Sequence, residues 1–479
     1  MAEFGELGKW IADSNEALSI SLVEPSSTGL KEIAKFNPEF TYTIFGEEQQ
    51  VFGYTKLDIN LRYRANDMRP NLQMKYSEKF KPIGETTAMD VVDMMKTDGC
   101  LPEIAFTKAA DFESNSQKMT DDWTPPGELH ASFEGPDATY EIWKGGLEDP
   151  AIKQLNARLQ VLVPLFIEGG SFIQDLDDDV EAPSDDDRWT LFLLYRKSSP
   201  ASDSSKSSYV FAGYSTVYRF FYFQPPSPPP SPQQDWELPT QNLTFSSMPS
   251  RTRLSQFIIL PPFQSKGLGT RLYETIFKHY YNEASTLEFT IENPNEGFDK
   301  IRDVCDLKFL RSLPTFSALK LNEAAAVPHS GSVPSLISGG DVDAIRRASK
   351  IAPRQFNRVL EMQIMSQLPE SVQPTVEIEV KKPASTKEDR HLERLWQIFA
   401  KQRLYRHNRE ALSQMEHADR VQKLHETLNQ VEYGYALILN PSKASEADES
   451  GSSSGQTNGK RKLDDDDETS SKKARVDDE

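Results

Sequence analysis

Alternating apolar positions open the first folded part of the chain. Leu18, Ile20 and Leu22 occupy every second position, which is the period of a strand with one buried face. Residues 40–64 then contain two stretches rich in aromatic and β-branched residues, on either side of the polar residues 46–50. Because such residues favour strands, the sequence predicts a hairpin with an acidic tip.

The middle of the chain contains longer apolar stretches. Residues 160–173, 189–195 and 209–223 are each predicted to form a strand of a sheet. Three polar segments lie between or after them: 175–187 is acidic, 198–208 is rich in Ser and 224–234 is rich in Pro. These compositions are typical of disordered loops, so we expect paired strands with long connections.

The pattern then changes to a strand, a glycine turn, a helix and a second strand. Residues 253–260 predict the first strand, which Pro261 and Pro262 end. Residues 267–281 carry an apolar stripe at four-residue spacing, which predicts an amphipathic helix, and residues 286–291 predict the next strand. This order indicates a βαβ-like unit inside a mixed sheet.

Helical spacing dominates beyond about residue 313. Pro353 stands where a helix can begin, and apolar stripes continue around Trp396 and Leu428. From residue 441 the chain is rich in Ser, Gly, Asp and Lys and lacks aromatic residues, so this tail is expected to be disordered. We therefore expect an α+β protein with an N-terminal mixed domain, a sheet core flanked by helices, a helical domain and a tail, at residues 1–120, 121–315, 316–440 and 441–479.

The formal net charge of −19 limits the choice of partners. An acidic chain is a poor ligand for nucleic-acid phosphates, so no direct DNA binding is expected. A basic protein partner fits this charge, although acidity that serves only solubility fits it as well.

Cys100 and Cys305 are the two cysteines, and they form no CxxC pair. A disulfide framework and a zinc site are therefore not expected, whereas a reducing compartment is. The N-terminus has no secretory signal pattern, and no apolar run reaches the roughly 18 residues that span a bilayer. We expect a soluble intracellular protein with neither a metal site nor a membrane segment.

The clearest chemical motif is the hexapeptide QSKGLG at residues 264–269, between a predicted strand and a predicted helix. Glycines allow a tight turn that brings backbone N–H groups close to a pyrophosphate, and the helix N-terminus adds its positive dipole end. The motif is neither a P-loop, because no Gly-Lys-Ser/Thr follows, nor a Rossmann fingerprint, because the third glycine is absent. It predicts an anion site, with a plain structural turn as the alternative.

Pro261 and Pro262 indicate a gap in the sheet. A proline cannot donate to a sheet ladder, so the strand must part from its neighbour there. Such a gap would free backbone polar groups beside residues 257–259 for a ligand, whereas an ordinary strand end would create no ligand site.

The order of these elements and their motifs resemble the GNAT superfamily of acetyl-CoA-dependent N-acetyltransferases. Within it, SQFIILPPFQSKGLGTRLYETIFKHYY and LEFTIENPNEGFDKIRD are similar to the family of type B histone acetyltransferase catalytic subunits. Further similar stretches, in the order of that family, are NPEFTYTIFGEEQQVFGY, LFIEGGSFI, DDDRWTLFLLY and GYSTVYRFFYF. The resemblance covers about residues 37–303 and implies a GNAT-type mixed β-sheet core flanked by helices.

The resemblance also implies roles for residues beside the gap and in earlier segments. Glu292 matches the catalytic base, and Asn293 stands where the family often has Asp. Positions that match the acetyl-CoA site are Phe257, Ile258, Ile259, Gln264, Ser265, Lys266, Gly267, Leu268, Gly269, Thr270 and Asn295. Positions that match the histone-binding groove are Glu47, Glu48, Gln49, Glu168, Trp189, Tyr218, Arg219 and Phe220.

The implied activity is acetyl transfer from acetyl-CoA to lysines of the histone H4 N-terminal tail, on newly made, free histone. A lysine amine, whose ordinary pKa is about 10.4, must lose its proton before it attacks the thioester, and a buried Glu292 would take that proton directly or through a water. Backbone N–H groups of the parted strand could stabilise the oxyanion, and no covalent acyl-enzyme is required. Cys305 as a nucleophile is disfavoured against a buried structural cysteine.

The resemblance further implies a β-propeller histone-binding subunit as partner and a location in both cytoplasm and nucleus. Basic clusters at residues 460–462 and 472–475 resemble a bipartite nuclear signal, although a solvated tail of mixed charge is the alternative. Two other functions stay open at this point: a GNAT enzyme acting on another amine, and a non-catalytic histone-binding module.

Overall fold

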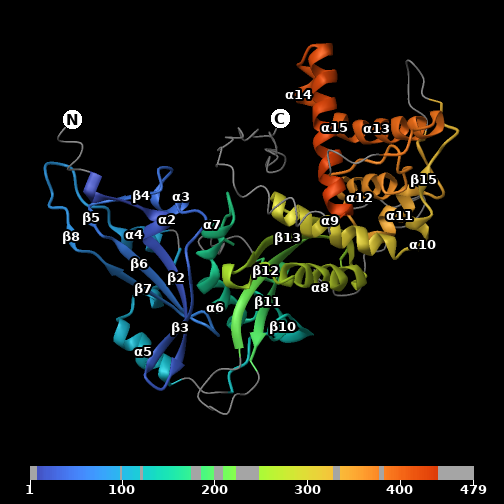
Figure 1. The fold of residues 1–479 in the computed structure, drawn as a ribbon. Helices are drawn as coiled ribbons and strands as arrows, with labels where there is room; N and C mark the ends of the chain where they lie inside the picture. The colour runs from blue at the N-terminus through green and yellow to red at the C-terminus, as the bar shows by residue number, and fades with distance from the viewer. Residues whose placement is uncertain are drawn as a thin grey trace, which may run out of the picture. The chain divides into compact units, whose positions relative to one another are not determined.

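The computed structural model describes residues 8–97, 100–118, 122–173, 185–198, 209–222, 248–326, 335–376 and 382–440. The chain divides into two compact units, Met1–Gln367 and Leu368–Glu479 (Figure 1). Most of the segments 175–187 and 198–208, all of 224–234 and the tail from residue 441 lie outside the described ranges, so what the sequence predicts for them stays a prediction.

The first unit opens with a four-stranded sheet. Its strands are β2 (Leu18–Ser26), β3 (Gly29–Phe36), β6 (Asp58–Arg64) and β7 (Pro70–Lys75), and helix α5 (Ala109–Gln117) packs against them. The strand order is β3-β2-β6-β7, and β2 runs parallel to β6 but antiparallel to β3. Leu18, Ile20 and Leu22 are fully buried, as their alternation predicts.

The hairpin predicted at residues 40–64 is wrong in its first half. The second stretch forms β4 (Gln50–Phe52), β5 (Tyr54–Thr55) and β6, whereas the first forms the short helix α3 (Tyr42–Phe45). The hydroxyl of Thr41, just before α3, forms hydrogen bonds with Ser14 at 2.5 Å and Asn15 at 2.8 Å. These bonds to an earlier segment override the strand propensity of the aromatic residues.

A six-stranded sheet forms the larger core of the first unit. Its strands are β9 (Glu128–Glu134), β10 (Thr139–Gly146), β11 (Trp189–Lys197), β12 (Tyr209–Phe221), β13 (Ser250–Ile259) and β14 (Thr286–Ile291). The order is β14-β13-β12-β11-β10-β9, and only β13 and β14 are parallel. Helix α8 (Leu268–Asn282) packs against β11, β13 and β14 and buries Leu272, Tyr273 and Ile276. The predicted strand-helix-strand unit is therefore confirmed.

The strand predicted at residues 160–173 is wrong. Its apolar part forms helix α7 (Leu162–Phe166), which follows helix α6 (Pro150–Leu159). All residues of α7 are buried, so the segment has no polar face whose period could distinguish a helix from a strand.

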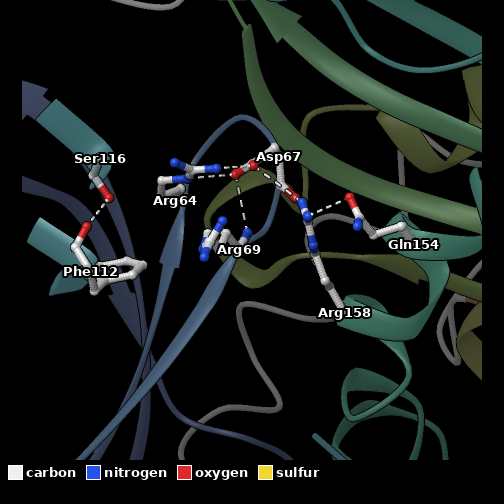
Figure 2. A network of polar contacts seen from close by, with 7 residues as sticks. All are labelled: Arg64, Asp67, Arg69, Phe112, Ser116, Gln154 and Arg158. Carbon is white, nitrogen blue, oxygen red and sulfur yellow. Dashed lines mark hydrogen bonds and ion pairs between the residues drawn. The ribbon is translucent and has the colours of Figure 1, made fainter. Parts of the chain in front are cut away.

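A buried ionic network joins the N-terminal sheet to α6. Asp67, in the turn between β6 and β7, accepts hydrogen bonds from Arg64 and from Arg158 of α6 (Figure 2). Arg158 Nη1 lies 3.2 Å from the Asp67 carboxylate and 2.8 Å from the Asp67 backbone oxygen. Tyr63 in β6 donates its hydroxyl hydrogen to the Arg158 carbonyl at 3.0 Å. Since α6 packs against β10, the network connects the two sheets.

Helices complete both units. In the first unit, α9 (Glu296–Arg311) contacts α8 and α12 (Pro353–Met365), and α12 begins at Pro353 as the sequence predicts. In the second unit, α13 (Lys387–His407) packs against α15 (His417–Leu439). The predicted α+β class with helices at the C-terminal end is confirmed, whereas the domain limits at residues 120, 315 and 440 stay a prediction.

The remaining elements are short. They are η1 (Gly8–Trp10), β1 (Ile11–Asp13), α2 (Ser14–Ala17), β8 (Glu78–Lys79), α4 (Val91–Lys96), η3 (Glu103–Phe106), η5 (Asp186–Arg188), η7 (Pro261–Phe263), α10 (Pro314–Ser317), β15 (Lys320–Leu321), β16 (Ile337–Ser338), α11 (Val342–Ser349) and α14 (Arg409–Ser413). Within the described ranges, no helix has both the length and the apolar content needed to cross a bilayer.

Candidate active site

The two parallel strands β13 and β14, at one edge of the six-stranded sheet, part before β13 ends. Their pairing ends at Leu254 and Ile291, followed by one backbone bond of 2.9 Å from the Glu292 N–H to the Leu254 carbonyl. Strand β13 continues to Ile259, paired there with β12 alone among the described strands. The parting that Pro261 and Pro262 predict is thus present, and it opens an edge of β13 over residues 255–259.

The glycine motif forms a tight turn into α8. Gly267 is the N-cap residue, with a left-handed φ of 73°, and no side chain in the described structure accepts a hydrogen bond from the first turn of the helix. Gln264 Nε2 donates to the Ile259 carbonyl at 2.9 Å, which ties the loop back to the open strand. A glycine in this conformation followed by an uncapped helix N-terminus suits a bound pyrophosphate.

A cavity of about 790 Å³ extends from this loop to the gap between the strands. Of the positions matched to the acetyl-CoA site, most line it: Phe257, Ile259, Gln264, Ser265, Gly267, Leu268, Gly269, Thr270 and Asn295. Two do not. Ile258 is buried on the other face of the strand, as alternation requires, and Lys266 forms an ion pair with Asp137 at 3.0 Å.

Glu292 lies at the cavity with both carboxylate oxygens engaged. Ser255 donates its hydroxyl hydrogen to Oε2, and Arg253 Nη1 lies 3.7 Å from Oε1. The Glu292 side chain is 41% exposed, so the burial expected for a base is not found here. Its neighbour Asn295 caps α9, because its Oδ1 accepts from the Phe298 N–H at 2.8 Å.

The opposite wall of the cavity comes from segments far away in the sequence. The backbone N–H groups of Glu39 and Phe40 donate to the Leu165 carbonyl at 2.9 and 3.1 Å. Tyr42 accepts a hydrogen bond from the Gly169 N–H at 2.7 Å. These bonds bring lining residues of two separate segments together: Glu39, Phe40, Phe166, Ile167 and Glu168.

Sequence reasoning missed the lining role of Glu39, Phe40, Phe298 and Ile301, although all four lie inside stretches that resemble the family. No period or motif marks these residues. Only their position in the folded chain brings them to the cavity.

Three of the positions matched to the histone groove form a row of aromatic rings. The Trp189 and Tyr218 ring centroids are 4.7 Å apart, and those of Tyr218 and Phe220 are 4.6 Å apart. Burial raises the pKa of Tyr218, whose hydroxyl accepts a hydrogen bond from Arg188 at 3.3 Å. Arg219 is not brought into this row, because alternation turns it to the other face, where it contacts Ser285 and Glu283.

The remaining groove positions, Glu47, Glu48 and Gln49, do not line the cavity. Glu47 and Glu48 are exposed in the turn after α3. Gln49 has a structural task, because its Oε1 accepts hydrogen bonds from the Asn15 side chain at 2.8 Å and the Thr41 N–H at 3.1 Å.

Cys305 is buried in α9, and burial raises the pKa of its thiol to about 12. A thiol in that state is a poor nucleophile, which agrees with the structural role favoured from the sequence. Across the described ranges, no three His, Cys, Asp or Glu side chains gather as metal ligands would.

The chain matches known proteins over nearly its whole length. A family model described as the N-terminus of the histone acetyl transferase HAT1 matches residues 10–168. A histone acetyltransferase type B catalytic subunit from Gibberella zeae is 54% identical, covering 98% of this chain and 99% of the relative. The chain belongs to the family of type B histone acetyltransferase catalytic subunits.

Other members of this acetyltransferase family agree. Proteins of the same name from Neurospora crassa and Pyricularia oryzae are 44% and 47% identical, each with 98% of both chains covered. The resemblance and the enzyme class inferred from the sequence are confirmed, and membership implies acetyl-CoA as co-substrate. The left-handed Gly267 and the uncapped N-terminus of α8 fit the pyrophosphate of that co-substrate.

Proposed function

We propose that this acetyltransferase moves acetyl from acetyl-CoA to lysine side chains of the histone H4 N-terminal tail. The observation that supports this most is that one cavity contains the glycine loop, the open edge of β13 and the carboxylates of Glu292 and Glu168. The substrate class is supported by the names of the relatives, which are histone acetyltransferases.

In this proposal each part of the cavity has one task. The loop at residues 264–270 and the strand edge at residues 257–259 would hold acetyl-CoA, which supplies an acetyl group activated as a thioester. Glu292 accepts the proton that the lysine amine must lose, since an amine with an ordinary pKa of about 10.4 is protonated at neutral pH. The free backbone groups along the open edge of β13 are available as polar partners in the same place.

The charge of the cavity favours a basic substrate. Glu39, Glu168 and Glu292 all line it, and the whole chain carries a formal net charge of −19. Complementary charge raises the rate of encounter with a Lys- and Arg-rich tail. The row Trp189, Tyr218 and Phe220 would contact that tail next to the cavity.

We further propose that the acceptor is newly made, free histone, so that the reaction precedes chromatin assembly. The resemblance supports a β-propeller histone-binding subunit as partner and activity in cytoplasm and nucleus. For the tail, the basic clusters at residues 460–462 and 472–475 support nuclear import.

Turnover of acetyl-CoA with matched acceptors tests the proposal. The acceptors are an H4 tail peptide, the same peptide with every lysine replaced by arginine, a polyamine and a peptide with only a free N-terminus. We expect rapid turnover with the first peptide alone. Faster turnover with the polyamine or the N-terminal peptide would make the protein an acetyltransferase for another amine, and peptide binding without turnover would make it a binding module.

A further inference from the structure

Two similar rows of aromatic ring, arginine and glutamate run across β13. The aromatic residue lies in β12 or just after it, and the glutamate lies in β14 or just after it. In what we term the inner row, the Arg251 guanidinium lies 4.9 Å from the Tyr222 ring centroid and 2.9 Å from Glu288. In the outer row, the Arg253 guanidinium lies 4.5 Å from the Phe220 ring centroid and 3.7 Å from Glu292.

The inner row has a structural role, because its glutamate is buried and lies away from the cavity. The Glu288 side chain is only 9% exposed and lies 3.9 Å from a second arginine, Arg346 of α11. Glu288 does not line the cavity. The outer row has the same composition, but its glutamate stands where the strands part and lines the cavity. The two rows therefore form a natural pair for comparison.

Ser255, at a bulge in β13, adds a second contact to the outer row. The register of β12 passes from Thr216 opposite Gln256 to Val217 opposite Leu254, so Ser255 has no partner residue in β12. Strand β13 nevertheless keeps its regular alternation of buried and partly exposed residues, so Ser255 lies on the same face as Arg253. Here the Ser255 hydroxyl donates to Glu292 Oε2, while Arg253 lies beside Oε1.

We propose that Ser255 and Arg253 are positioning residues for the acetyl-transfer reaction. Together they hold the Glu292 carboxylate by one oxygen each, and the Phe220 ring in turn fixes the arginine. A carboxylate so held meets the acceptor amine in one orientation instead of many, which is the condition for efficient proton transfer. This inference rests on the proposed role of Glu292 as base.

The two contacts differ in strength. The Arg253–Glu292 pair is long, and its side chains are 36% and 41% exposed, so water screens it. The bond from the Ser255 hydroxyl to a charged acceptor is the stronger one. We therefore expect Ser255→Ala to lower kcat by about tenfold and Arg253→Gln by about threefold, both with a nearly unchanged KM for acetyl-CoA.

A double-mutant cycle with Glu292→Gln tests the inference. If Ser255 and Arg253 act through the Glu292 carboxylate, each substitution should lower kcat in the wild-type background and change it by less than about twofold in the Glu292→Gln background. Ser255→Thr keeps the hydroxyl and should restore most of the rate. A role in folding alone would instead lower the rate equally in both backgrounds and lower the melting temperature.

Arg251→Gln is the matched control, because it makes the same change in the inner row. It should show no coupling to Glu292→Gln. Near-wild-type kcat in Ser255→Ala and Arg253→Gln, or equal losses in both backgrounds, would overturn the positioning role while leaving the proposed function intact. Near-wild-type kcat in Glu292→Gln itself would overturn the base assignment, and the positioning role with it.

Discussion

The pairing of the sheet strands determines the position of Glu292. The last backbone bond between β13 and β14 begins at its own N–H, so the strands place the residue at the point where they separate. The asparagine at 293 adopts a positive φ of 33° immediately afterwards, and Asn295 starts α9. A side chain placed between a strand end and a helix cap has little backbone freedom, which suits a reacting group.

Glu292→Gln should lower the single-turnover rate by about 10²–10⁴, because the amide keeps the shape but cannot accept the proton. Acetyl-CoA binding, measured by calorimetry, should barely change, since the loop and the open strand are untouched.

Glu168 is the competing carboxylate, because it lines the same cavity from the opposite wall. Single-turnover rates of Glu168→Gln and of the double variant separate the two residues. A collapse in Glu168→Gln together with near-wild-type rates in Glu292→Gln would assign the base to Glu168.

Asp306 gives a second prediction at this scale, for stability. Burial raises the pKa of Asp306 to about 6, although the Tyr273 hydroxyl donates to it at 2.8 Å and Arg302 lies 3.6 Å away. The carboxyl group of an unfolded Asp has a pKa of about 3.9, so the folded state binds this proton more tightly. The contribution of this group to stability is therefore complete below about pH 4 and is lost as the pH rises through about 6.

Urea unfolding of wild type and Asp306→Asn between pH 4 and pH 7 measures this contribution. Asn does not titrate and can still accept from Tyr273. The free energy of unfolding of the wild type should fall relative to the variant by about 2–3 kcal/mol over this range. A difference that does not change with pH would contradict the raised pKa.

At the scale of elements, the sequence predicted best where a polar face remains. Helix α8 and strand β14 agree with their predicted limits because each has partly exposed positions beside its buried ones. Helix α7 was not predicted because all its residues are buried, and β9 was missed because its side chains are nearly all partly exposed. Helix α3 depends on Ser14 and Asn15, which no local pattern reveals.

In the candidate site, features that depend on local residues could likewise be predicted, whereas features that depend on long-range contacts could not. The loop at residues 264–270 and the parted strand could be predicted, because glycine and proline restrict or free the backbone locally. The wall formed by Glu39 and Phe40 could not, because two backbone bonds to Leu165 place it there. The contact of Ser255 with Glu292 could not be predicted either, because it joins residues 37 positions apart in the sequence.

The turn between β13 and α8 carries the element-scale prediction. Gly267→Val should raise the KM for acetyl-CoA, because a β-branched residue cannot adopt φ of 73° without strain and the turn would change shape. Gly269→Val should do so for another reason: a Cβ there would lie 3.2 Å from Ile301 Cδ1, so the end of that side chain, which also lines the cavity, must give way. Steady-state kinetics at saturating peptide measures both. An unchanged KM in either folded variant would remove that glycine from the site.

At the scale of the whole molecule, Asp67 is the carboxylate of the ionic network that connects the two sheets. Asp67→Asn would leave the buried guanidinium groups of Arg64 and Arg158 without a carboxylate, and breaking such a pair costs about 3–5 kcal/mol. Glu113→Gln is the control, since its pair with Arg62 is half exposed and should contribute no more than about 1 kcal/mol. Urea unfolding followed by tryptophan fluorescence compares them. Equal small losses would show that the network does not stabilise the fold.

Deletion of residues 441–479 tests the tail. Its composition provides no apolar core, so acetyl transfer in vitro should stay within about twofold of the full chain. Nuclear accumulation of a fluorescent fusion should fall, because the two basic clusters are lost. A collapse of activity in vitro would instead place the tail in the catalytic unit.

The bonds from Glu39 and Phe40 to Leu165 also determine when the site can form during synthesis. The N-terminal segment leaves the ribosome long before α7 does, and β14 and α9 emerge later still. The cavity wall that Glu39 and Phe40 form is therefore incomplete until segments distant in the sequence have been made, and such long-range contacts form slowly. A nascent chain that stops before β14 lacks both Glu292 and Asn295, the cap of α9. Such a chain lacks the residues at which β13 and β14 part, so the enzyme becomes active only once most of its first unit has been made.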